Sequence, residues 1–137
     1  MSHVVPDLVQ KILKGQDPLH ILGAGNQIRC YTYGGDLAKG ICTTMFHPAA
    51  KNNDFNISTR QATNVLELGE AIWKKIHGDA KPFRYVSDDP FPYDVQKRVP
   101  DVTKAAKVLG YEANTSLSAI LDEVIPWIKT ELAAGRI

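Results

Sequence analysis

Apolar residues recur at helical spacing in five segments of the chain. In residues 5–13, the positions of Val5, Leu8, Val9 and Ile12 predict an amphipathic helix that ends before Gly15. Similar patterns predict four more helices, over residues 36–46, 64–76, 101–109 and 115–132. Short apolar or alternating runs predict strands over residues 19–22, 28–33, 55–58 and 83–86. Together these segments indicate a mixed α/β fold in which helix dominates.

Capping residues indicate where two of these helices begin. Asp36 is a good N-cap, and we expect its helix to carry Leu37, Ile41 and Met45 toward the core. Asn64 is followed three residues later by a glutamate, which predicts a capping box at the start of the third helix.

Composition and charge exclude several classes of protein. The 137 residues suit one domain, and we expect residues 1–137 to form it. Sixteen basic and fifteen acidic residues leave a net charge of +1, which gives no general attraction to nucleic acid or to an anionic membrane. No run approaches the roughly 18 apolar residues of a membrane span. Two cysteines, Cys30 and Cys42, without a secretory leader predict free thiols and a cytoplasmic location.

The sequence offers little sign of a catalytic centre. The four histidines are 17, 27 and 30 residues apart, a spacing that gives no positive evidence of a metal site. Gly23-Ala24-Gly25 precedes a predicted strand rather than a helix, which favours a hairpin turn over a dinucleotide-binding loop. Tyr93 and Lys97 have the Tyr-x-x-x-Lys spacing of short-chain dehydrogenases, but they lie in a proline-rich region, 87–100, where we expect an ordered loop. We interpret this match as coincidental.

Two stretches of the chain carry a family resemblance. Residues 18–38 read PLHILGAGNQIRCYTYGGDLA, and residues 96–105 read QKRVPDVTKA and are followed by Leu109-Gly110-Tyr111. Phe55-Asn56-Ile57 lies between them. In order and spacing, these stretches resemble signatures of the extended short-chain dehydrogenase/reductases. The resemblance is to their NAD-dependent epimerase/dehydratase family, which includes nucleotide-sugar epimerases, 4,6-dehydratases and UDP-glucuronate decarboxylase-like enzymes.

The resemblance implies that the chain is the C-terminal, substrate-binding lobe of such an enzyme, with the Rossmann half absent. In the family, the glycine-rich NAD-binding loop, the catalytic Ser/Thr and the Tyr-x-x-x-Lys helix belong to that other half. The resemblance therefore implies no cofactor and no catalytic residue in this chain, NAD in the full-length enzyme, and no activity of the isolated chain. The implied partners are a nucleotide-sugar, such as a UDP-sugar, and the missing N-terminal Rossmann domain.

The resemblance assigns the pyrophosphate of that ligand to Arg29 and Arg98, which would hold it from opposite sides. Guanidinium groups suit this role because they bind phosphate oxygens in a planar, bidentate geometry. The alternative is a surface ion pair, for instance between Arg29 and Asp36. Strand alternation puts Tyr31 on the same face as Arg29, so we expect Tyr31 to line the same cleft.

Four other residues are implied to contact the ribose or the base. Asp101 resembles a carboxylate that accepts hydrogen bonds from ribose hydroxyls, and it suits a helix N-cap equally well. His20 and Leu22 match positions that pack on the base, although packing within a strand explains Leu22 without a ligand. Asn64 matches a nucleotide contact, but its capping role is the preferred interpretation.

A second function stays open, that of a non-catalytic protein-interaction module derived from such an enzyme. Nucleic-acid binding is disfavoured by the charge balance and by the lack of a basic, aromatic-lined stripe. Without the Rossmann half, helix faces and the strand at Phe55 would be exposed. We therefore expect a homodimer formed through exposed apolar surface, or a swapped arrangement.

Overall fold

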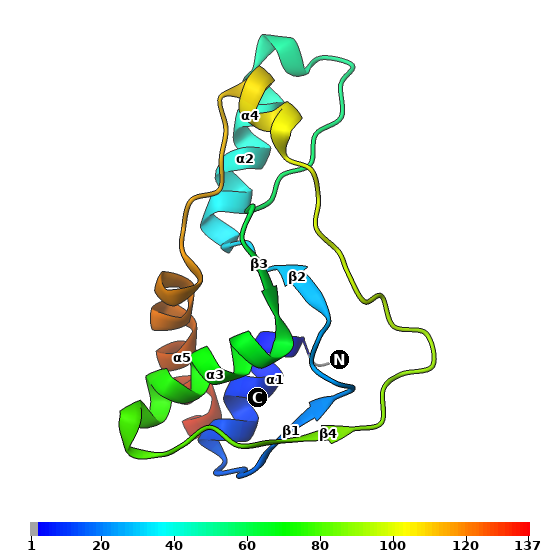
Figure 1. Ribbon diagram of the computed structural model, residues 1–137. Coiled ribbons are helices and arrows are strands. Elements are labelled where there is room, and N and C mark those ends of the chain that lie inside the picture. The colour runs from blue at the N-terminus through cyan, green and yellow to red at the C-terminus, as the bar shows by residue number, and fades with distance from the viewer. Residues whose placement is uncertain (1–2) are drawn as a thin grey trace. The chain divides into compact units, whose positions relative to one another are not determined.

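The computed structural model describes residues 3–137, and its internal contacts divide the chain into two compact units (Figure 1). The first unit comprises the residues up to Gln27, together with Asn64–Gln96 and Ser118–Ile137. The second comprises Ile28–Thr63 and Lys97–Leu117. The described residues form five α-helices and four strands, which confirms the mixed, helix-rich fold predicted from the hydrophobic pattern.

The first unit combines a parallel strand pair with three helices. Its elements are α1 (Val4–Leu13), β1 (Leu19–Leu22), α3 (Val65–His77), the short 3₁₀ helix η2 (Gly78–Ala80), β4 (Tyr85–Asp88) and, from Ser118 on, α5 (Leu117–Ala133). Strand β1 pairs with β4, and α1 packs on α3 (Figure 1). Buried apolar side chains from these elements form the core: Leu8, Val9, Ile12, Leu19, Ile21, Leu68, Ile72, Trp73, Ile120, Leu121 and Ile128.

The second unit is smaller and has a core of its own. Its elements are β2 (Ile28–Cys30), α2 (Gly34–Phe46), the 3₁₀ helix η1 (Pro48–Ala50), β3 (Ala62–Asn64, whose last residue belongs to the first unit) and α4 (Thr103–Leu109). Strand β2 pairs with β3. The core consists of Ala50, Ala105, Leu109, Tyr111 and Ala113. No helix within residues 3–137 is both long and apolar enough to cross a membrane.

The strand predicted over residues 55–58 is wrong. Residues 53–58 have no regular secondary structure, and the strand forms further along the chain, as β3. Phe55 and Ile57 instead pack on the core of the second unit, and the Asn56 amide donates to the Asp101 carbonyl at 2.9 Å. The alternation of polar and apolar residues here reflects side-chain burial rather than backbone pairing. The strand predicted over residues 28–33 also ends early, at Cys30.

Helix α2 begins earlier than its capping signal predicted. The helix starts at Gly34, with Tyr33 in the N-cap position, so the expected start at Asp36 is wrong. The Asp36 carboxylate accepts a hydrogen bond from the Thr115 amide at 2.9 Å. Because its carboxylate binds a segment far along the chain, Asp36 makes a tertiary contact and does not cap the helix.

The buried face of α2 also differs from the prediction. Leu37, Ile41 and Met45, which we expected to point inward, are 40%, 48% and 70% exposed. The buried residue is Gly40. A Cβ at this position would lie 2.8 Å from the Tyr111 ring, and it would also clash with a methyl group of the Ile57 side chain. The helix therefore packs through its smallest residue, which a pattern based on large apolar side chains does not detect.

We expect Gly40→Ala to lower the free energy of unfolding by about 1–2 kcal/mol. Overpacking a core costs roughly 1–3 kcal/mol, which exceeds the gain of about 1 kcal/mol in helix propensity when glycine becomes alanine. Urea denaturation followed by circular dichroism measures the change. Gly34→Ala in the same helix is the control, because a Cβ there meets nothing within 4 Å and should not destabilise the protein. Equal stability of the two variants would contradict the packing described.

Candidate functional site

The two predicted pyrophosphate-binding arginines lie next to each other in the second unit. Lys97 forms a parallel bridge with Ile28, and the Arg98 amide donates a hydrogen bond to the Ile28 carbonyl at 3.0 Å. The Arg29 guanidinium donates to the same carbonyl oxygen through Nη1, at 2.9 Å. A single backbone oxygen atom thus accepts hydrogen bonds from both arginine residues.

The register of this bridge sets the direction of the two side chains. Because Ile28 lies opposite Lys97, Arg29 lies opposite Arg98, and residues opposite each other across paired strands project to the same face. Arg98 is exposed, and within residues 3–137 no hydrogen bond or ion pair holds its side chain. Arg29 is only partly exposed. The pair therefore offers one anchored and one uncommitted guanidinium on a common face.

Tyr31 follows β2 closely and carries an unsatisfied hydroxyl. Its oxygen is buried and has no hydrogen-bond partner in the part of the chain that the structure describes. Burial raises the pKa of this phenol, and the positive charge of Arg29 opposes part of that rise. A buried hydroxyl without a partner is costly, so this group is a candidate contact for a bound polar ligand.

Asp101 lies two residues before the start of α4. Its carboxylate accepts a hydrogen bond from the Thr103 amide at 2.9 Å. Hydrogen bonds from the Thr103 hydroxyl and amide keep the pKa of Asp101 below its usual value, with smaller contributions from the charges of Arg60 and Lys107. The helix begins at Thr103 with Val102 in the N-cap position, so the predicted start and N-cap at Asp101 are wrong, and the Asp101 side chain binds the first helical amide from one residue further back. The group is also exposed and ionised, as an acceptor for ribose hydroxyls must be.

The remaining predicted contacts belong to the first unit. His20 Nδ1 lies 2.8 Å from a carboxylate oxygen of Asp88, at the end of the neighbouring strand. Leu22 ends β1 and is 43% exposed. Asn64 accepts a hydrogen bond from the Glu67 amide at 2.8 Å, and its own amide donates to the Glu67 carboxylate at 2.9 Å, so the predicted capping box is confirmed. Contact of these three residues with a base stays a prediction.

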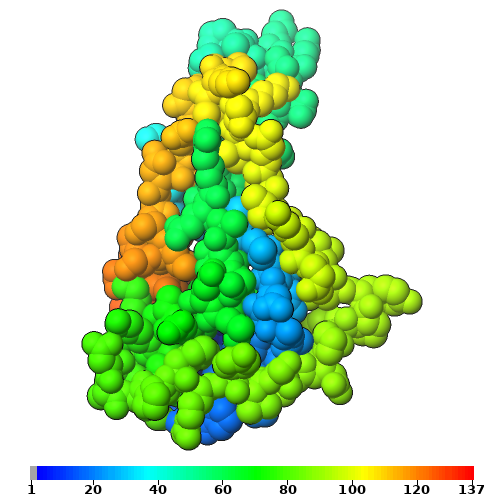
Figure 2. All heavy atoms as spheres, in the orientation of Figure 1, coloured from blue at the N-terminus to red at the C-terminus, as the bar shows by residue number. Residues whose placement is uncertain are grey.

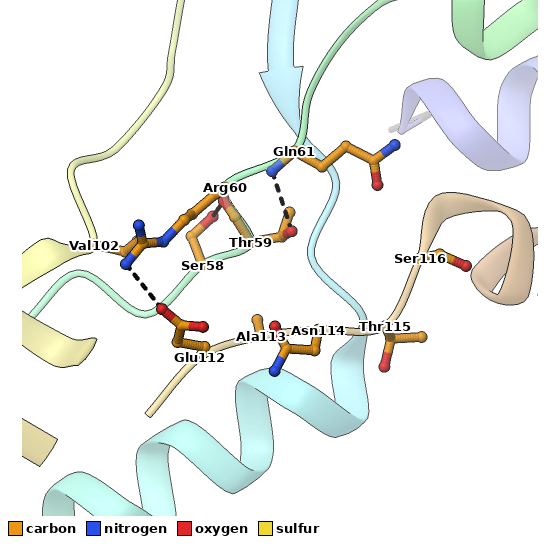
Figure 3. A pocket seen from close by; sticks show the side chains of 10 residues that line it. All are labelled: Ser58, Thr59, Arg60, Gln61, Val102, Glu112, Ala113, Asn114, Thr115 and Ser116. Carbon is orange, nitrogen blue, oxygen red and sulfur yellow. Dashed lines mark hydrogen bonds and ion pairs between the residues drawn. The ribbon is translucent and has the colours of Figure 1, made fainter. Parts of the chain in front are cut away.

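A polar pocket that sequence analysis missed lies elsewhere in the second unit (Figure 3). It has a volume of about 240 Å³ and lies between residues 58–61 and 112–116, which a bridge from Thr59 to Ala113 joins. At one end, Arg60 donates to Glu112 at 2.9 Å. Neither Arg29 nor Arg98 lines this pocket. The only signal in the sequence is a third arginine shortly after the Phe-Asn-Ile stretch.

The turn at Gly23 and Gly25 does not fit a dinucleotide. Strand β2 follows it, rather than a helix whose N-terminus would face a phosphate. A Cβ at Gly25 would lie 2.6 Å from the Leu66 side chain, so this glycine is required by packing within the chain. The predicted hairpin is wrong, however, because β1 pairs with β4 and β2 with β3.

The Tyr-x-x-x-Lys match lies in a loop, as predicted. Residues 91–96 contain no helix, and Tyr93 is 98% exposed. In Figure 2 this segment, coloured yellow-green, lies on the surface. Within the described range, no group of three or more His, Cys, Asp or Glu residues is placed to hold a metal ion.

Comparison with known proteins identifies the class of protein to which this fold and these motifs belong. Residues 1–124 match the GDP-mannose 4,6 dehydratase family. The chain therefore belongs to this family of NAD-dependent epimerases and dehydratases, and it corresponds to the C-terminal part of such proteins. The resemblance seen in the two sequence stretches is confirmed.

Individual relatives agree with this assignment. A putative UDP-glucose 4-epimerase of Methanocaldococcus jannaschii is 33% identical over 128 residues, which cover 92% of this chain and 39% of that protein. The crystal structure of UDP-glucose 4-epimerase from Thermotoga maritima with UDP-glucose has a TM-score of 0.81 at 31% identity, over 96% of this chain and 40% of that one. UDP-glucuronic acid 4-epimerase from Bacillus cereus, in complex with UDP-glucuronic acid and NAD, has a TM-score of 0.83 at 25% identity, over 94% and 40%.

The chain is much shorter than these proteins. It spans 25% to 40% of the length of the first curated relatives that it matches. The lobe-like fold that we expected is confirmed, since the similarity to these structures covers nearly the whole of this chain.

We expect Asn64→Ala to destabilise the protein by about 1 kcal/mol, the usual cost of removing an N-cap side chain. Asn64→Ser should retain most of the stability, because a serine hydroxyl also accepts the hydrogen bond from the Glu67 amide. Thermal or urea unfolding separates the two variants. If Asn64→Ser were as unstable as Asn64→Ala, the capping box would not be the main role of this residue.

Proposed function

We propose that this chain is the nucleotide-sugar-binding part of an NAD-dependent epimerase/dehydratase, in which Arg29 and Arg98 bind the pyrophosphate of the ligand. The observation that carries the proposal is the shared Ile28 carbonyl, with hydrogen bonds of 2.9 Å from the Arg29 guanidinium and 3.0 Å from the Arg98 amide. UDP-sugars bound in the structures of relatives support the same ligand class.

The chemistry of a diphosphate matches this arrangement. The oxygens on its two adjacent phosphorus atoms carry the negative charge. Each guanidinium can donate two parallel hydrogen bonds to the oxygens of one phosphate group. Arg98 is exposed and uncommitted, so it can turn toward a ligand without breaking an existing contact. Arg29 is already held against the backbone, which lowers the entropy lost when it binds.

Five further residues are proposed to bind the parts of the ligand beyond the phosphates. We assign ribose hydroxyls to the Asp101 carboxylate, which is ionised and exposed. The Tyr31 hydroxyl would gain the hydrogen-bond partner that it lacks within the described residues. His20, Leu22 and Asn64 are proposed to contact the base. In all these contacts the ligand is held far from the carbon that reacts.

The role proposed for the lobe is to supply binding energy rather than chemistry. Interactions with a non-reacting part of a substrate can be used to orient the reacting part. In the described residues, the glycine turn does not fit a dinucleotide and Tyr93 and Lys97 lie in a loop, so hydride transfer would depend on NAD held by an N-terminal Rossmann domain. That domain is therefore the second proposed partner of the chain.

Titration calorimetry with UDP tests the proposed site. We expect measurable binding, and we expect Arg98→Ala to weaken it roughly 10- to 100-fold, because a hydrogen bond to a charged group contributes about 1.5–3 kcal/mol. Arg98→Lys should restore only part of the affinity, since an ammonium group cannot bind in the bidentate manner. GDP in a parallel titration shows whether the base is discriminated.

Arg136→Ala is the matched control for this titration. Arg136 is paired with Glu131 and is not among the residues assigned to the ligand, so its removal should leave UDP affinity unchanged. Failure of the unmodified chain to bind UDP would favour the non-catalytic interaction module. Equal affinity of the Arg98→Ala variant would refute the pyrophosphate assignment.

We also expect the isolated chain to convert no UDP-glucose or UDP-glucuronic acid in the presence of NAD. The measurement is product analysis by chromatography over long incubations, with NADH absorbance as a second readout. Turnover that persists in highly purified protein and falls in a variant of this chain would show that a catalytic centre lies within it.

A further inference from the structure

The side chain of Asn56 joins two segments of the second unit that are 45 positions apart in the sequence. Its Nδ2 group donates a hydrogen bond to the backbone carbonyl of Asp101 at 2.9 Å. Neither residue belongs to a helix or a strand. A side-chain hydrogen bond therefore takes the place that backbone pairing has between the strands of this unit.

The residues on either side of Asn56 fix the direction of its side chain. Phe55 and Ile57 are partly buried and pack on the core of the second unit, whereas Asn56 is exposed. The Lys104 ammonium, in the first turn of α4, lies 5.0 Å from the centre of the Phe55 ring. The segment that contains Asn56 is thus anchored on the core and on α4, so the amide of Asn56 is presented from a fixed base.

The loop that Asn56 contacts is attached at both of its ends. The Arg98 amide donates to the Ile28 carbonyl at 3.0 Å, and three residues later the Asp101 carbonyl accepts from Asn56. Between these two attachments lies Pro100, whose ring fixes its own φ and restricts the residue before it. The backbone from residue 98 to residue 101 therefore has little freedom, provided that both attachments are intact.

We propose that Asn56 is a positioning residue for the nucleotide, because it holds the Asp101 carboxylate at a set distance from the Arg98 guanidinium. This inference rests on the proposed function, from which it takes the roles of Arg98 and Asp101. The ribose and the pyrophosphate of a nucleoside diphosphate are covalently joined, so the groups that bind them must keep a matching separation. A loop that is ordered in advance loses less conformational entropy when the ligand binds.

Titration calorimetry of the intact chain with UDP tests the proposal. We expect Asn56→Ala to weaken binding roughly three- to tenfold, the effect of losing one hydrogen bond. Asn56→Ser removes the same contact, because the shorter side chain does not reach the Asp101 carbonyl, and should give a similar loss. Circular dichroism and urea denaturation establish that each variant is folded at the temperature of the titration.

A double-mutant cycle with Asp101→Asn separates positioning from a general effect on the fold. Asp101→Asn removes the carboxylate, but it keeps the backbone carbonyl that accepts the hydrogen bond from Asn56. If Asn56 acts through Asp101, then Asn56→Ala should change UDP affinity by less than about twofold in the Asp101→Asn background. A purely structural role would give the same loss of affinity in both backgrounds.

Asn53→Ala is the matched control for Asn56→Ala. Asn53 is also exposed and lies in the same segment, and its Nδ2 group donates to the Ala49 carbonyl at 3.1 Å. The substitution therefore removes a comparable hydrogen bond that does not involve the loop of Asp101. We expect it to leave UDP affinity unchanged.

The outcomes distinguish this inference from the proposed function. If Arg98→Ala weakens UDP binding and Asn56→Ala does not, the positioning role is wrong and the pyrophosphate assignment stands. Equal losses for Asn56→Ala in the two backgrounds, or for Asn53→Ala and Asn56→Ala, also overturn the positioning role. If the unmodified chain does not bind UDP, both proposals are wrong. A loss that is specific to Asn56 and disappears in the Asp101→Asn background supports the inference.

Discussion

The carbonyl oxygen of Ile28 holds together the part of the molecule on which the functional interpretation depends. Arg29 and Arg98 are 69 positions apart in the sequence. The hydrogen bond from the Arg98 amide joins the two segments of the second unit, and the Arg29 guanidinium uses the same acceptor. A carbonyl oxygen has two lone pairs, so both bonds can form without competition. One local arrangement thus supports the fold and places two cationic side chains on one face.

The helices could be predicted from the sequence because most of them bury a stripe of large apolar residues. Helix α3 shows this well, since its cap at Asn64 and its buried residues Leu68 and Ile72 follow the 3.6-residue period. Helix α2 could not be predicted in the same way. Its core contact is made by Gly40, where the absence of a side chain is what allows close packing. Periodicity identified the helix correctly but assigned its inner face to the wrong side.

The candidate site was predictable in its parts but not in its assembly. Arg29 and Arg98 each stood out in a motif, yet no local pattern shows that residue 97 pairs with residue 28. Pairing between distant segments depends on tertiary packing, which propensity does not encode. The same limit explains the missed pocket, because the ion pair of Arg60 with Glu112 joins segments 52 residues apart.

Three kinds of group in this chain differ in what they imply about a ligand: an exposed charge, a buried unpaired hydroxyl and an exposed apolar side chain. An exposed guanidinium such as that of Arg98 is well hydrated, so its exposure alone carries no argument for a ligand. The Tyr31 hydroxyl has lost contact with water without gaining a partner among the described residues, and such a group is costly until something binds it. Apolar exposure on α2 is costly in the same sense, since each uncovered side chain orders or excludes water. The apolar side chains exposed on α2 lose that cost only in an apolar contact, whereas the Tyr31 hydroxyl needs a polar group. The chemistry that would satisfy each of these two features is therefore different.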